Sequence, residues 1–354
     1  MSPRTSAVSF VRTLPQLEPY LGATVEQLEY YADQLERSRL VELYTVTRGE
    51  KQRQVTRPTN EALKNIHRRM LSLLTGVSMD LPLHVTGYVR GRSIYINAVP
   101  HVGNRYLQRF DLKSFFDHVD QQSIVAGLVH YGFHEVVAVM LARLATVNGR
   151  LPTGFATSPS MANIAMAAFD NQLVALADDL GVSVTRYADD ITFSGAMLFD
   201  VTEPMLLLCQ THGHEINLDK VRTLKYGQPL YVTGLSTSES DAPRLPRPFK
   251  KRLRQELYYI GRYGLESHAQ RVHVPADKLR LRLGGRIAYA ESIEPAFVSR
   301  LLADLPGGAA AVRRAPSAES EEKRTASLMR LATRILDSEA TRAEPYVPSH
   351  TYLT

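Results

Sequence analysis

The chain has 354 residues, of which 44% are hydrophobic and 22% charged, enough to bury a sizeable core in one large domain or two to three subdomains. Its single cysteine, Cys209, and the lack of any CxxC, HExxH or Cys/His cluster argue against disulfides and a structural zinc site. The N-terminus has no basic-then-apolar signal, and no run of about 18 apolar residues appears, so we expect neither secretion nor membrane insertion and a cytoplasmic location.

The elements predicted in chain order alternate between helices and strands. Helical patterns are expected over residues 14–40, 61–77, 123–146, 161–180, 203–214 and 247–262. Strands are expected over residues 41–58 as a hairpin around Gly49, over 106–112, over 183–195 as a second hairpin, and as a short pair near 216–235. This alternation predicts an α+β fold with helices on one face of an antiparallel sheet.

Basic residues are concentrated near one predicted helix. The net charge of +6 alone indicates little about partners, but residues 244–254 (RLPRPFKKRLR) hold six basic and no acidic side chains. Phe249, Leu253, Leu257 and Ile260 follow at helical spacing, which predicts a helix with an apolar face and a cationic one. The cationic face is either simply solvated or binds a polyanion.

Residues 186–195 (RYADDITFSG) place two adjacent carboxylates at the tip of the second hairpin. Aspartates favour turns, so such a pair is by itself weak evidence of function. The chain offers its own comparison, since Asp178 and Asp179 form another pair that we interpret as a solvated helix end. What distinguishes Asp189 and Asp190 is a third acid, Asp111, at the end of an earlier strand.

Asp111 and Asp189 both fall where an apolar strand meets polar turn residues. On neighbouring strands they could hold two Mg²⁺ ions, which prefer carboxylate oxygens and substrate phosphates and can activate a hydroxyl and stabilise a leaving pyrophosphate. Because successive residues of a regular strand face opposite ways, Asp190 joins them only if the turn is distorted, and it ranks below the other two.

Three ordered motifs carry a family resemblance. YADD at 187–190 resembles the YxDD box of reverse transcriptases, and DLKSFF at 111–116 resembles their first catalytic-acid motif. LPTGFATSP at 151–159 is similar to their LPQG…SP loop, which lies against the templating base and incoming nucleotide. NAVPH at 97–101 and VTG at 232–234 resemble the NAxxH and VTG elements that together mark retron reverse transcriptases.

This resemblance covers about residues 15–300 and implies a right-hand polymerase fold, with fingers, a palm built on an antiparallel sheet backed by helices, and a helical thumb. The implied divisions are an N-terminal helical region at 1–40, fingers with the NAxxH region at 41–110, palm at 111–240, thumb at 241–304, and a linker with a C-terminal tail at 305–354.

The resemblance also implies roles for individual residues. Asp111, Asp189 and Asp190 become metal ligands, with the Leu112 carbonyl as a further one, and Lys220 matches the late-palm lysine that protonates leaving pyrophosphate. RNA contacts are implied for the NAxxH and VTG residues and for the basic helix, namely Asn97, His101, Val232, Thr233, Gly234, Arg247, Lys250, Lys251 and Arg254. Asn97 and His101 are alternatively buried polar residues with satisfied hydrogen bonds.

The same comparison implies a nucleotide site. Phe116 matches the steric gate that selects deoxynucleotides, although an ordinary core phenylalanine would occupy the same place. Arg53 matches the fingers arginine that grips the triphosphate, while Lys51 either assists it or is a solvated turn lysine. Thr153 and Gly154 belong to the nucleotide loop, and Thr153 replaces the usual glutamine, so hydrogen bonding there must differ.

By resemblance, the partners are a cognate structured non-coding RNA of msr-msd type, dNTPs and a branched msDNA product started from the 2′-OH of an internal guanosine. No stretch resembles an RNase H domain, so template removal is expected to need host RNase H. A separate effector protein in anti-phage defence is implied, and the tail at 323–354 is a candidate for docking it.

Three other interpretations remain. Another bacterial reverse transcriptase, of group II intron or defence-associated type, would share the acids but is disfavoured by NAVPH and VTG. A polymerase-derived RNA-binding scaffold without catalysis would have no need of Asp111, Asp189, Asp190 and Phe116 together. A plain basic RNA-binding protein leaves the ordered motifs unexplained.

Overall fold

The computed structural model describes residues 11–303 apart from 50 and 240, with the side chains of 48, 51, 78 and 79 also left undescribed. It divides into two compact units, Met1–Thr233 and Gly234–Thr354. The predicted linker and tail at 305–354 lie outside the described residues. In the part of the chain that is described, no helix is both long and apolar enough to cross a membrane.

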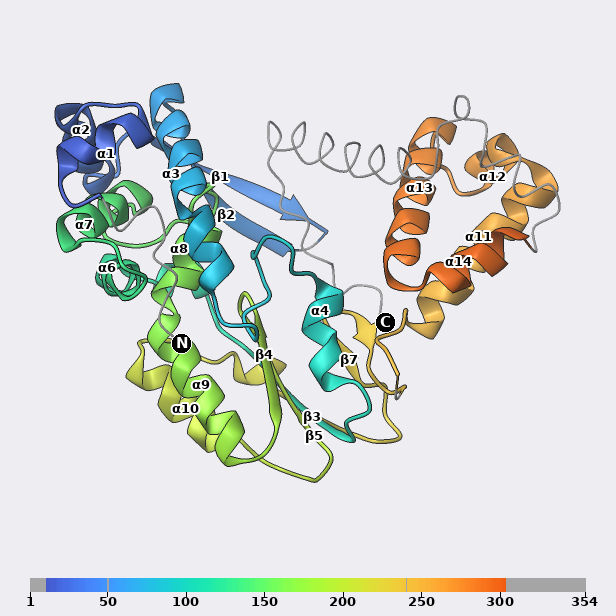
Figure 1. The fold of residues 1–354 in the computed structure, drawn as a ribbon. Helices are drawn as coiled ribbons and strands as arrows, with labels where there is room; N and C mark the ends of the chain where they lie inside the picture. Colours follow the sequence, from blue (N-terminus) through green and yellow to red (C-terminus); the bar gives the residue numbers. More distant parts are fainter. Residues whose placement is uncertain (1–10, 50, 240, 304–354) are drawn as a thin grey trace. The chain divides into compact units, whose positions relative to one another are not determined.

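The elements of unit 1 follow the expected alternation (Figure 1). Its helices are α1 (Leu14–Leu21), α2 (Val25–Glu36), α3 (Glu61–Asp80), α4 (Ile94–Ala98), η2 (Val99–His101), α5 (Phe115–His118), α6 (Gln121–His130), α7 (Glu135–Ala145), α8 (Ser158–Ala165), α9 (Ala167–Asp179), α10 (Thr202–Thr211) and η3 (Leu218–Lys220). Its strands are β1 (Val41–Arg48), β2 (Lys51–Pro58), β3 (Tyr106–Asp111), β4 (Ser183–Tyr187), β5 (Asp190–Gly195), β6 (Arg222–Lys225) and β7 (Tyr231–Val232).

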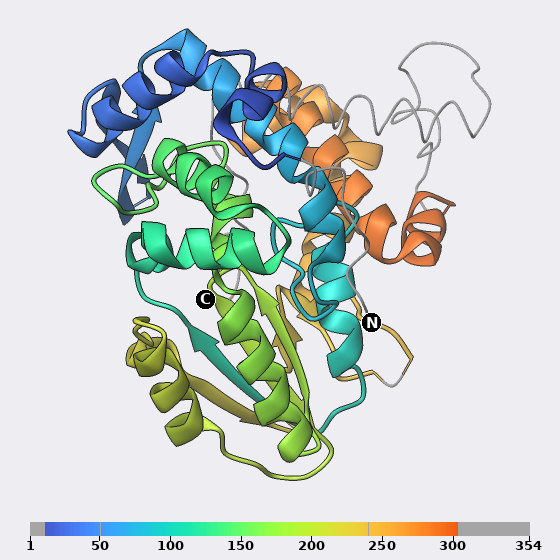
Figure 2. The same ribbon diagram turned by 60° about the vertical axis from the view of Figure 1, so that its left-hand side comes forward.

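An antiparallel four-stranded sheet in the order β4-β5-β3-β6 forms the centre of unit 1. Helices α9 and α10 cover one of its faces, as the two views of the ribbon show (Figures 1 and 2). Phe110 of β3 and Phe193 of β5 point into this layer and meet edge to face, with ring centroids 6.1 Å apart. The expected palm, an antiparallel sheet backed by helices, is thereby confirmed.

Local signals in the sequence explain where most helices begin and end. A capping box opens α2, because the Thr24 side chain accepts from Gln27 N and the Gln27 side chain accepts from Thr24 N. The single helix expected over 14–40 is instead two, because Gly22 ends α1 with a left-handed φ of 67°. The helix expected over 161–180 likewise divides at Met166 into α8 and α9.

Unit 2 is helical in its described part. It contains the short strand β8 (Leu235–Ser236) and the helices α11 (Arg247–Tyr263), α12 (Leu265–Arg271), α13 (Ala276–Ile293) and α14 (Pro295–Ala303). The apolar side of α11 is as predicted, since Leu253 and Leu257 are buried. The boundary between the units precedes the predicted start of the thumb at 241, and the finer divisions within unit 1 stay predictions.

Three buried histidines are expected to make the folded state sensitive to acid. Burial lowers the pKa of His67 and His214 to about 4 and that of His101 to about 3, from an ordinary value of 6.5. As the pH falls below 6.5, the unfolded chain binds protons that the folded chain does not, so the free energy of unfolding falls. Each histidine should cost about 2 kcal/mol between pH 7 and pH 5. Urea unfolding at the two pH values measures this, and equal free energies would contradict it.

Candidate active site

The turn that carries the adjacent acids is a two-residue hairpin connection between β4 and β5. Tyr187 pairs with Asp190, which leaves Ala188 and Asp189 as the loop. Ala188 has a positive φ of 58° and Asp189 does not, the pattern of a type II′ turn, in which the first position favours glycine. An alanine held in this conformation is a strained residue of the kind found at functional sites.

The hairpin brings the three predicted acids together. Asp111, the last residue of β3, lies directly opposite Asp190 in the antiparallel register, so their side chains emerge on the same face of the sheet. The Leu112 N–H donates to the Asp189 carbonyl at 3.0 Å, which fixes the turn beside the end of β3. In the antiparallel register Asp190 shares the face of Asp111, whereas Asp189 belongs to the turn that Ala188 shapes with its positive φ. The expected order, with Asp111 and Asp189 ahead of Asp190 as metal ligands, stays a prediction.

Burial and neighbouring carboxylates raise the pKa of both Asp189 and Asp190. Burial, followed by the charges of Asp190 and Asp111, raises the pKa of Asp189 to about 6. Burial also raises the pKa of Asp190, with Asp111 acting in the same direction and Arg109 opposing it. Buried carboxylates with raised pKa values in one place indicate a site that lacks positive charge.

Two basic side chains supply part of that charge. Lys220 Nζ lies 2.5 Å from Asp111 Oδ1, and its own side chain is 56% exposed. Arg109 Nη2 lies 3.8 Å from Asp190 Oδ1. Lys220 is thus next to the acids, as its predicted role requires. Arg109 was not predicted, although its position two residues before Asp111 in the same strand places both side chains on one face of the sheet.

The donor set suits a hard divalent cation, since carboxylate oxygens are what Mg²⁺ prefers. Within the described residues, however, no three Asp, Glu, His or Cys side chains are already gathered as a metal-binding cluster, and Lys220 pairs with Asp111 instead. Burial and the charges of Asp190 and Asp111 raise the pKa of Asp189, and a bound cation would act in the opposite direction. The Leu112 carbonyl stays a prediction as a ligand.

Two of the predicted nucleotide residues, Phe116 and Arg53, lie around Tyr88, which is itself near Asp189. Phe116 is partly buried against the core and follows the acid strand closely in the chain. Tyr88 lies beside it, with ring centroids 6.3 Å apart. Burial, then the charges of Asp189 and Tyr187, raise the pKa of the Tyr88 phenol to about 12, and Arg53 opposes this. Tyr88 therefore lies near Phe116, Asp189 and Arg53. Its positive φ of 59° is a signal that no sequence pattern reveals.

The predicted nucleotide loop packs against the hairpin that carries Arg53. The Thr56 N–H donates to the Thr153 carbonyl at 2.7 Å. Gly154 has a φ of 117°, and a Cβ there would lie 2.5 Å from Val55 Cγ1 and 2.6 Å from the Thr56 carbonyl oxygen. Glycine is therefore required at 154 by both conformation and close approach. The side chain of Lys51, at the start of β2, lies outside the described residues.

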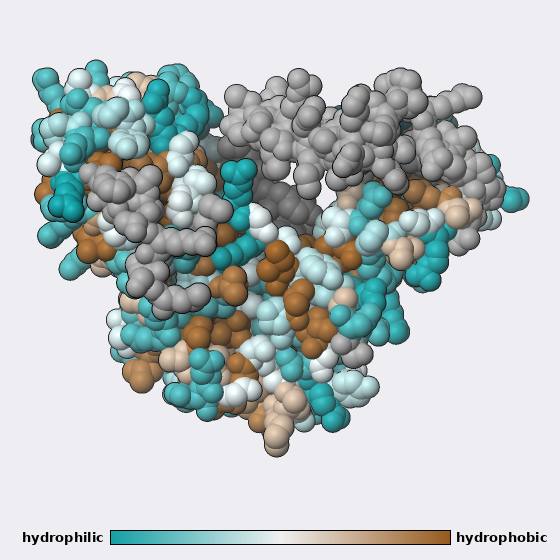
Figure 3. Space-filling model, viewed as in Figure 1, coloured by the Kyte–Doolittle hydropathy of each residue, from teal (hydrophilic) through white to brown (hydrophobic). Residues whose placement is uncertain are grey.

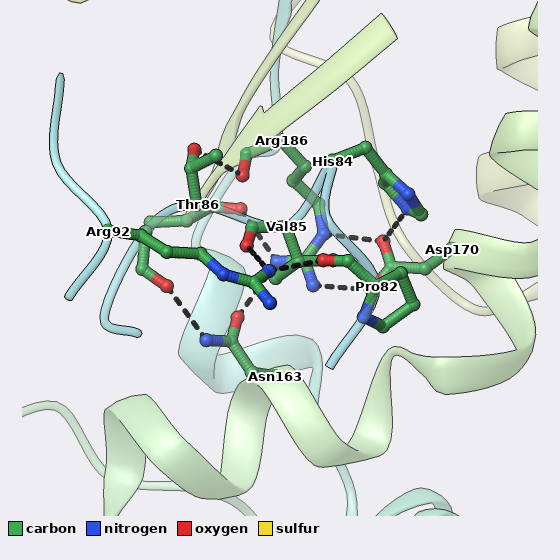
Figure 4. A network of polar contacts seen from close by, with 10 residues as sticks. Pro82, His84, Val85, Thr86, Arg92, Asn163, Asp170 and Arg186 are labelled. Carbon is green, nitrogen blue, oxygen red and sulfur yellow. Dashed lines mark hydrogen bonds and ion pairs between the residues drawn. The ribbon is translucent and has the colours of Figure 1, made fainter. Parts of the chain in front are cut away.

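Arg186, which closely precedes the turn, belongs to a buried polar network (Figure 4). The guanidinium of Arg186 is completely buried and makes a two-point contact with Asp170, with both nitrogen to oxygen distances 2.6 Å. It also donates to Asn163 Oδ1 at 3.2 Å and to the Ala188 carbonyl at 3.1 Å. Nothing in the sequence reveals the pair of Arg186 and Asp170. The same Arg186 side chain holds Ala188, the strained residue of the turn, through its hydrogen bond to the Ala188 carbonyl.

All four residues of unit 1 that are predicted to contact RNA are buried. Asn97 and His101 are each 1% exposed, and Val232 and Thr233 are also buried, while Gly234 at the start of unit 2 is exposed. Asn97 and His101 match the alternative interpretation of buried polar residues with satisfied hydrogen bonds. Direct contact of either side chain with RNA stays a prediction that the structure does not support.

The basic residues of α11 differ in what holds them. Arg247, Lys251 and Arg254 are exposed, and Lys250 is half-buried. Lys250 donates to the buried Glu294 at 2.7 Å, and the Arg254 guanidinium lies 5.0 Å from the Phe297 ring centroid. Three of the four predicted contacts on this helix, Arg247, Lys251 and Arg254, are accordingly exposed to a polyanion, and Arg254 also contacts Phe297.

Comparison with known proteins identifies the family. Residues 49–245 match the family model described as reverse transcriptase (RNA-dependent DNA polymerase). The retron Mx65 reverse transcriptase of Myxococcus xanthus is 30% identical over 314 residues, covering 82% of this chain and 70% of the relative. The retron Mx162 enzyme of the same organism is 29% identical over 362 residues, covering 89% and 71%.

Among solved structures, a telomerase from Candida albicans is similar, with a TM-score of 0.45 and 11% identity, covering 80% of this chain and 65% of that one. A likeness this distant carries no argument about the site. The family match and the two retron relatives are sufficient: the chain belongs to the retron-type reverse transcriptases, which are RNA-directed DNA polymerases.

Proposed function

We propose that this protein reverse transcribes its own structured non-coding RNA of msr-msd type from dNTPs, starting at the 2′-OH of an internal guanosine, and leaves a branched RNA–DNA product, the msDNA. The observation that carries the catalytic part is the register of β3 and β5, which sets Asp111 opposite Asp190 with Asp189 in the adjoining turn. The retron part is supported by the family of its relatives. We place the reaction in the cytoplasm, where dNTPs are available.

In this proposal, Asp111, Asp189 and Asp190 hold two Mg²⁺ ions. When bound, these ions would activate the attacking hydroxyl and neutralise charge on the leaving pyrophosphate. The chain's own residues position the nucleotide: Arg53 binds the triphosphate, and Phe116 excludes a ribose 2′-OH. Lys220, free to leave Asp111 because its side chain is largely exposed, donates a proton to the departing pyrophosphate.

The proposal includes partners that supply what the chain is not expected to provide. Host RNase H removes template RNA, and a separate effector protein joins the product in anti-phage defence. Arg247 and Lys251 of α11 contact RNA phosphates, because A-form RNA is recognised largely through its backbone.

Expression together with the native upstream DNA, followed by extraction of nucleic acid, tests the proposed function. Wild type should yield a short DNA joined to RNA, whose mobility shifts after RNase or debranching treatment. The Asp189→Asn plus Asp190→Asn variant should yield none. If wild type makes no such product but extends a primed RNA with dNTPs, a reverse transcriptase of another kind replaces the retron assignment.

Phe116→Val tests the gate. A smaller side chain should admit the 2′-OH, so the ratio of kcat/KM for dNTP to that for rNTP should fall about 10- to 100-fold, with dNTP incorporation largely kept. Single-nucleotide extension of a primed RNA with dTTP or UTP measures the ratio. An unchanged ratio in an active variant would show Phe116 to be an ordinary core residue.

A further inference from the structure

The NAVPH element at residues 97–101 buries the polar side chain of Asn97. Asn97 of α4 is 1% exposed, whereas the neighbouring apolar residues Ile96 and Val99 are 42% and 47% exposed. Apolar surface is accordingly visible over α4 in the space-filling view (Figure 3). A helix that buries an amide and exposes an isoleucine reverses the usual arrangement, so the buried amide must have polar partners.

Those partners form a directed chain of hydrogen bonds. The Thr86 hydroxyl donates to Asn97 Oδ1, and Asn97 Nδ2 donates to Thr233 Oγ1 at 3.3 Å. The Thr233 hydroxyl donates in turn to the Ile94 carbonyl at 3.1 Å. Both ends of the Asn97 amide are thereby used, one toward residue 86 and the other toward the VTG element.

The backbone conformation of Thr233 is unusual and depends on this series of hydrogen bonds. Its φ is 45°, a left-handed value that is rare for a β-branched residue. The two hydrogen bonds of its hydroxyl offset that strain, and the following Gly234, with a φ of 81°, adopts the same region at little cost. Residues 232–234 therefore suit a left-handed backbone at positions 233 and 234 and a hydrogen-bonded hydroxyl at position 233.

At its other end, the chain of bonds reaches the strand before the catalytic turn. The Thr86 N–H donates to the Arg186 carbonyl at 2.9 Å, and the Arg186 N–H donates to the His84 carbonyl at 2.8 Å. The segment around Thr86 thus lies alongside β4 as an added parallel partner. Gly87 next to it allows close approach, because a Cβ there would lie 2.4 Å from the Ala188 nitrogen.

His101 ties the two strands of the hairpin to the same element. Its Nδ1 lies 2.7 Å from Ser194 Oγ of β5, and its Nε2 lies 2.8 Å from Thr185 Oγ1 of β4. All three side chains are 1% exposed. One imidazole therefore spans both strands on either side of the turn that holds Asp189 and Asp190.

We propose that the NAVPH and VTG elements act as a buried brace of the catalytic hairpin, with Thr86, Asn97, His101 and Thr233 as positioning residues for Asp189 and Asp190. The inference rests on the proposed catalytic role of those acids. It assigns to the elements that mark this family a function in nucleotide transfer on any template, separate from recognition of one RNA. Because the four brace residues are buried, they can act on the hairpin without contacting RNA themselves.

The test uses a template that carries no cognate sequence, poly(rA) primed with oligo(dT). Thr86→Val and Thr233→Val remove one hydroxyl each with little change in shape. Misplaced carboxylates should lower kcat for dTTP about 10- to 100-fold, with KM for dTTP and Kd for the primed template within about twofold of wild type. Thr86→Ser and Thr233→Ser, which keep the hydroxyl, should recover most of the rate.

Thr146→Val is the matched control, because its equally buried hydroxyl bonds Ala142 and Gln121 and not the brace. It should leave kcat near the wild-type value. If the two brace variants also keep wild-type kcat on poly(rA)·oligo(dT), the brace is wrong. If wild type itself fails to extend this template, the proposed catalytic function fails instead.

Hydrogen exchange measured by mass spectrometry tests, independently of activity, whether the brace holds the hairpin in place. In Thr233→Val, peptides covering residues 183–195 should exchange about tenfold faster or more than in wild type, while peptides from α6 and α7 keep their rates. Unchanged exchange over 183–195 in a variant known to be folded would overturn the brace.

Discussion

Replacing Asp189 by asparagine should abolish nucleotide transfer and at the same time stabilise the metal-free protein. The pKa of Asp189 is raised to about 6, above its unfolded value, so its ionised form at pH 7 weakens the folded state. The neutral amide removes burial of charge and repulsion from Asp190 and Asp111. The free energy of unfolding in EDTA should rise by about 1–3 kcal/mol, while kcat falls at least about a thousandfold.

The sign of the pH dependence follows from the same shift. Lowering the pH from 7 through 6 protonates Asp189 and stabilises wild type at this position, a gain that Asp189→Asn lacks and that opposes the larger loss expected from the three buried histidines. Urea unfolding of both proteins at pH 7, with and without Mg²⁺, is the measurement. Mg²⁺ should stabilise wild type more than the variant.

The exposed pair at the end of α9 provides the control. Asp178→Asn plus Asp179→Asn should change the free energy of unfolding by no more than about 0.5 kcal/mol, because both side chains are exposed. The activity of this variant should equal that of wild type. An Asp189→Asn protein that is less stable than wild type in EDTA, or that keeps its activity, would contradict the assignment.

Replacing Arg186 by methionine should give the largest loss of stability. The substitution keeps much of the side-chain volume but leaves Asp170 buried without its two-point partner. Breaking a buried pair in this way costs about 3–5 kcal/mol. The Ala188 carbonyl also loses its donor, so activity should fall with stability.

A double variant separates the lost pair from the lost packing. Arg186→Met plus Asp170→Leu leaves no uncompensated carboxylate and should be more stable than Arg186→Met alone. Arg143→Met is the matched surface comparison, because Arg143 contacts the partly exposed Asp33 and Glu36 and should lose no more than about 1 kcal/mol. Equal urea midpoints for Arg186→Met and wild type would refute the argument.

The sequence predicted those features that depend on local pattern. The apolar run that ends at Asp111, and the strand residues on either side of the Asp189–Asp190 turn, are readable as strands because period-2 patterns are local. Helix ends marked by a capping box or a glycine were also predictable, as at Thr24 and Gly22, although the break at Gly22 was missed.

What the sequence did not predict depends on contacts between distant residues. The Arg186 to Asp170 pair joins a strand to a helix, and the Asn97 to Thr233 bond spans 136 positions. Motif matching drew attention to Asn97 and His101, but could not tell a residue that contacts RNA from one buried in the core of unit 1. Only burial and hydrogen-bond partners distinguish the two.

The positive φ values show a second kind of information that pattern analysis lacks. Ala188, Thr233 and Tyr88 all adopt left-handed backbone conformations that their residue types disfavour. Such strain persists only where the surrounding structure imposes it, as the Arg186 and Asn97 contacts do here. A residue-type pattern predicts glycine or asparagine at such positions and so cannot find them.

The most direct test of the central claim is single-turnover addition of dTTP to poly(rA)·oligo(dT) in Mg²⁺, comparing wild type with Asp111→Asn, Asp189→Asn and Asp190→Asn. The account predicts rapid addition by wild type and at least about a thousandfold slower addition by each variant, with primed-template affinity unchanged. Addition at the wild-type rate by any of the three would show that the corresponding acid is not part of the catalytic centre.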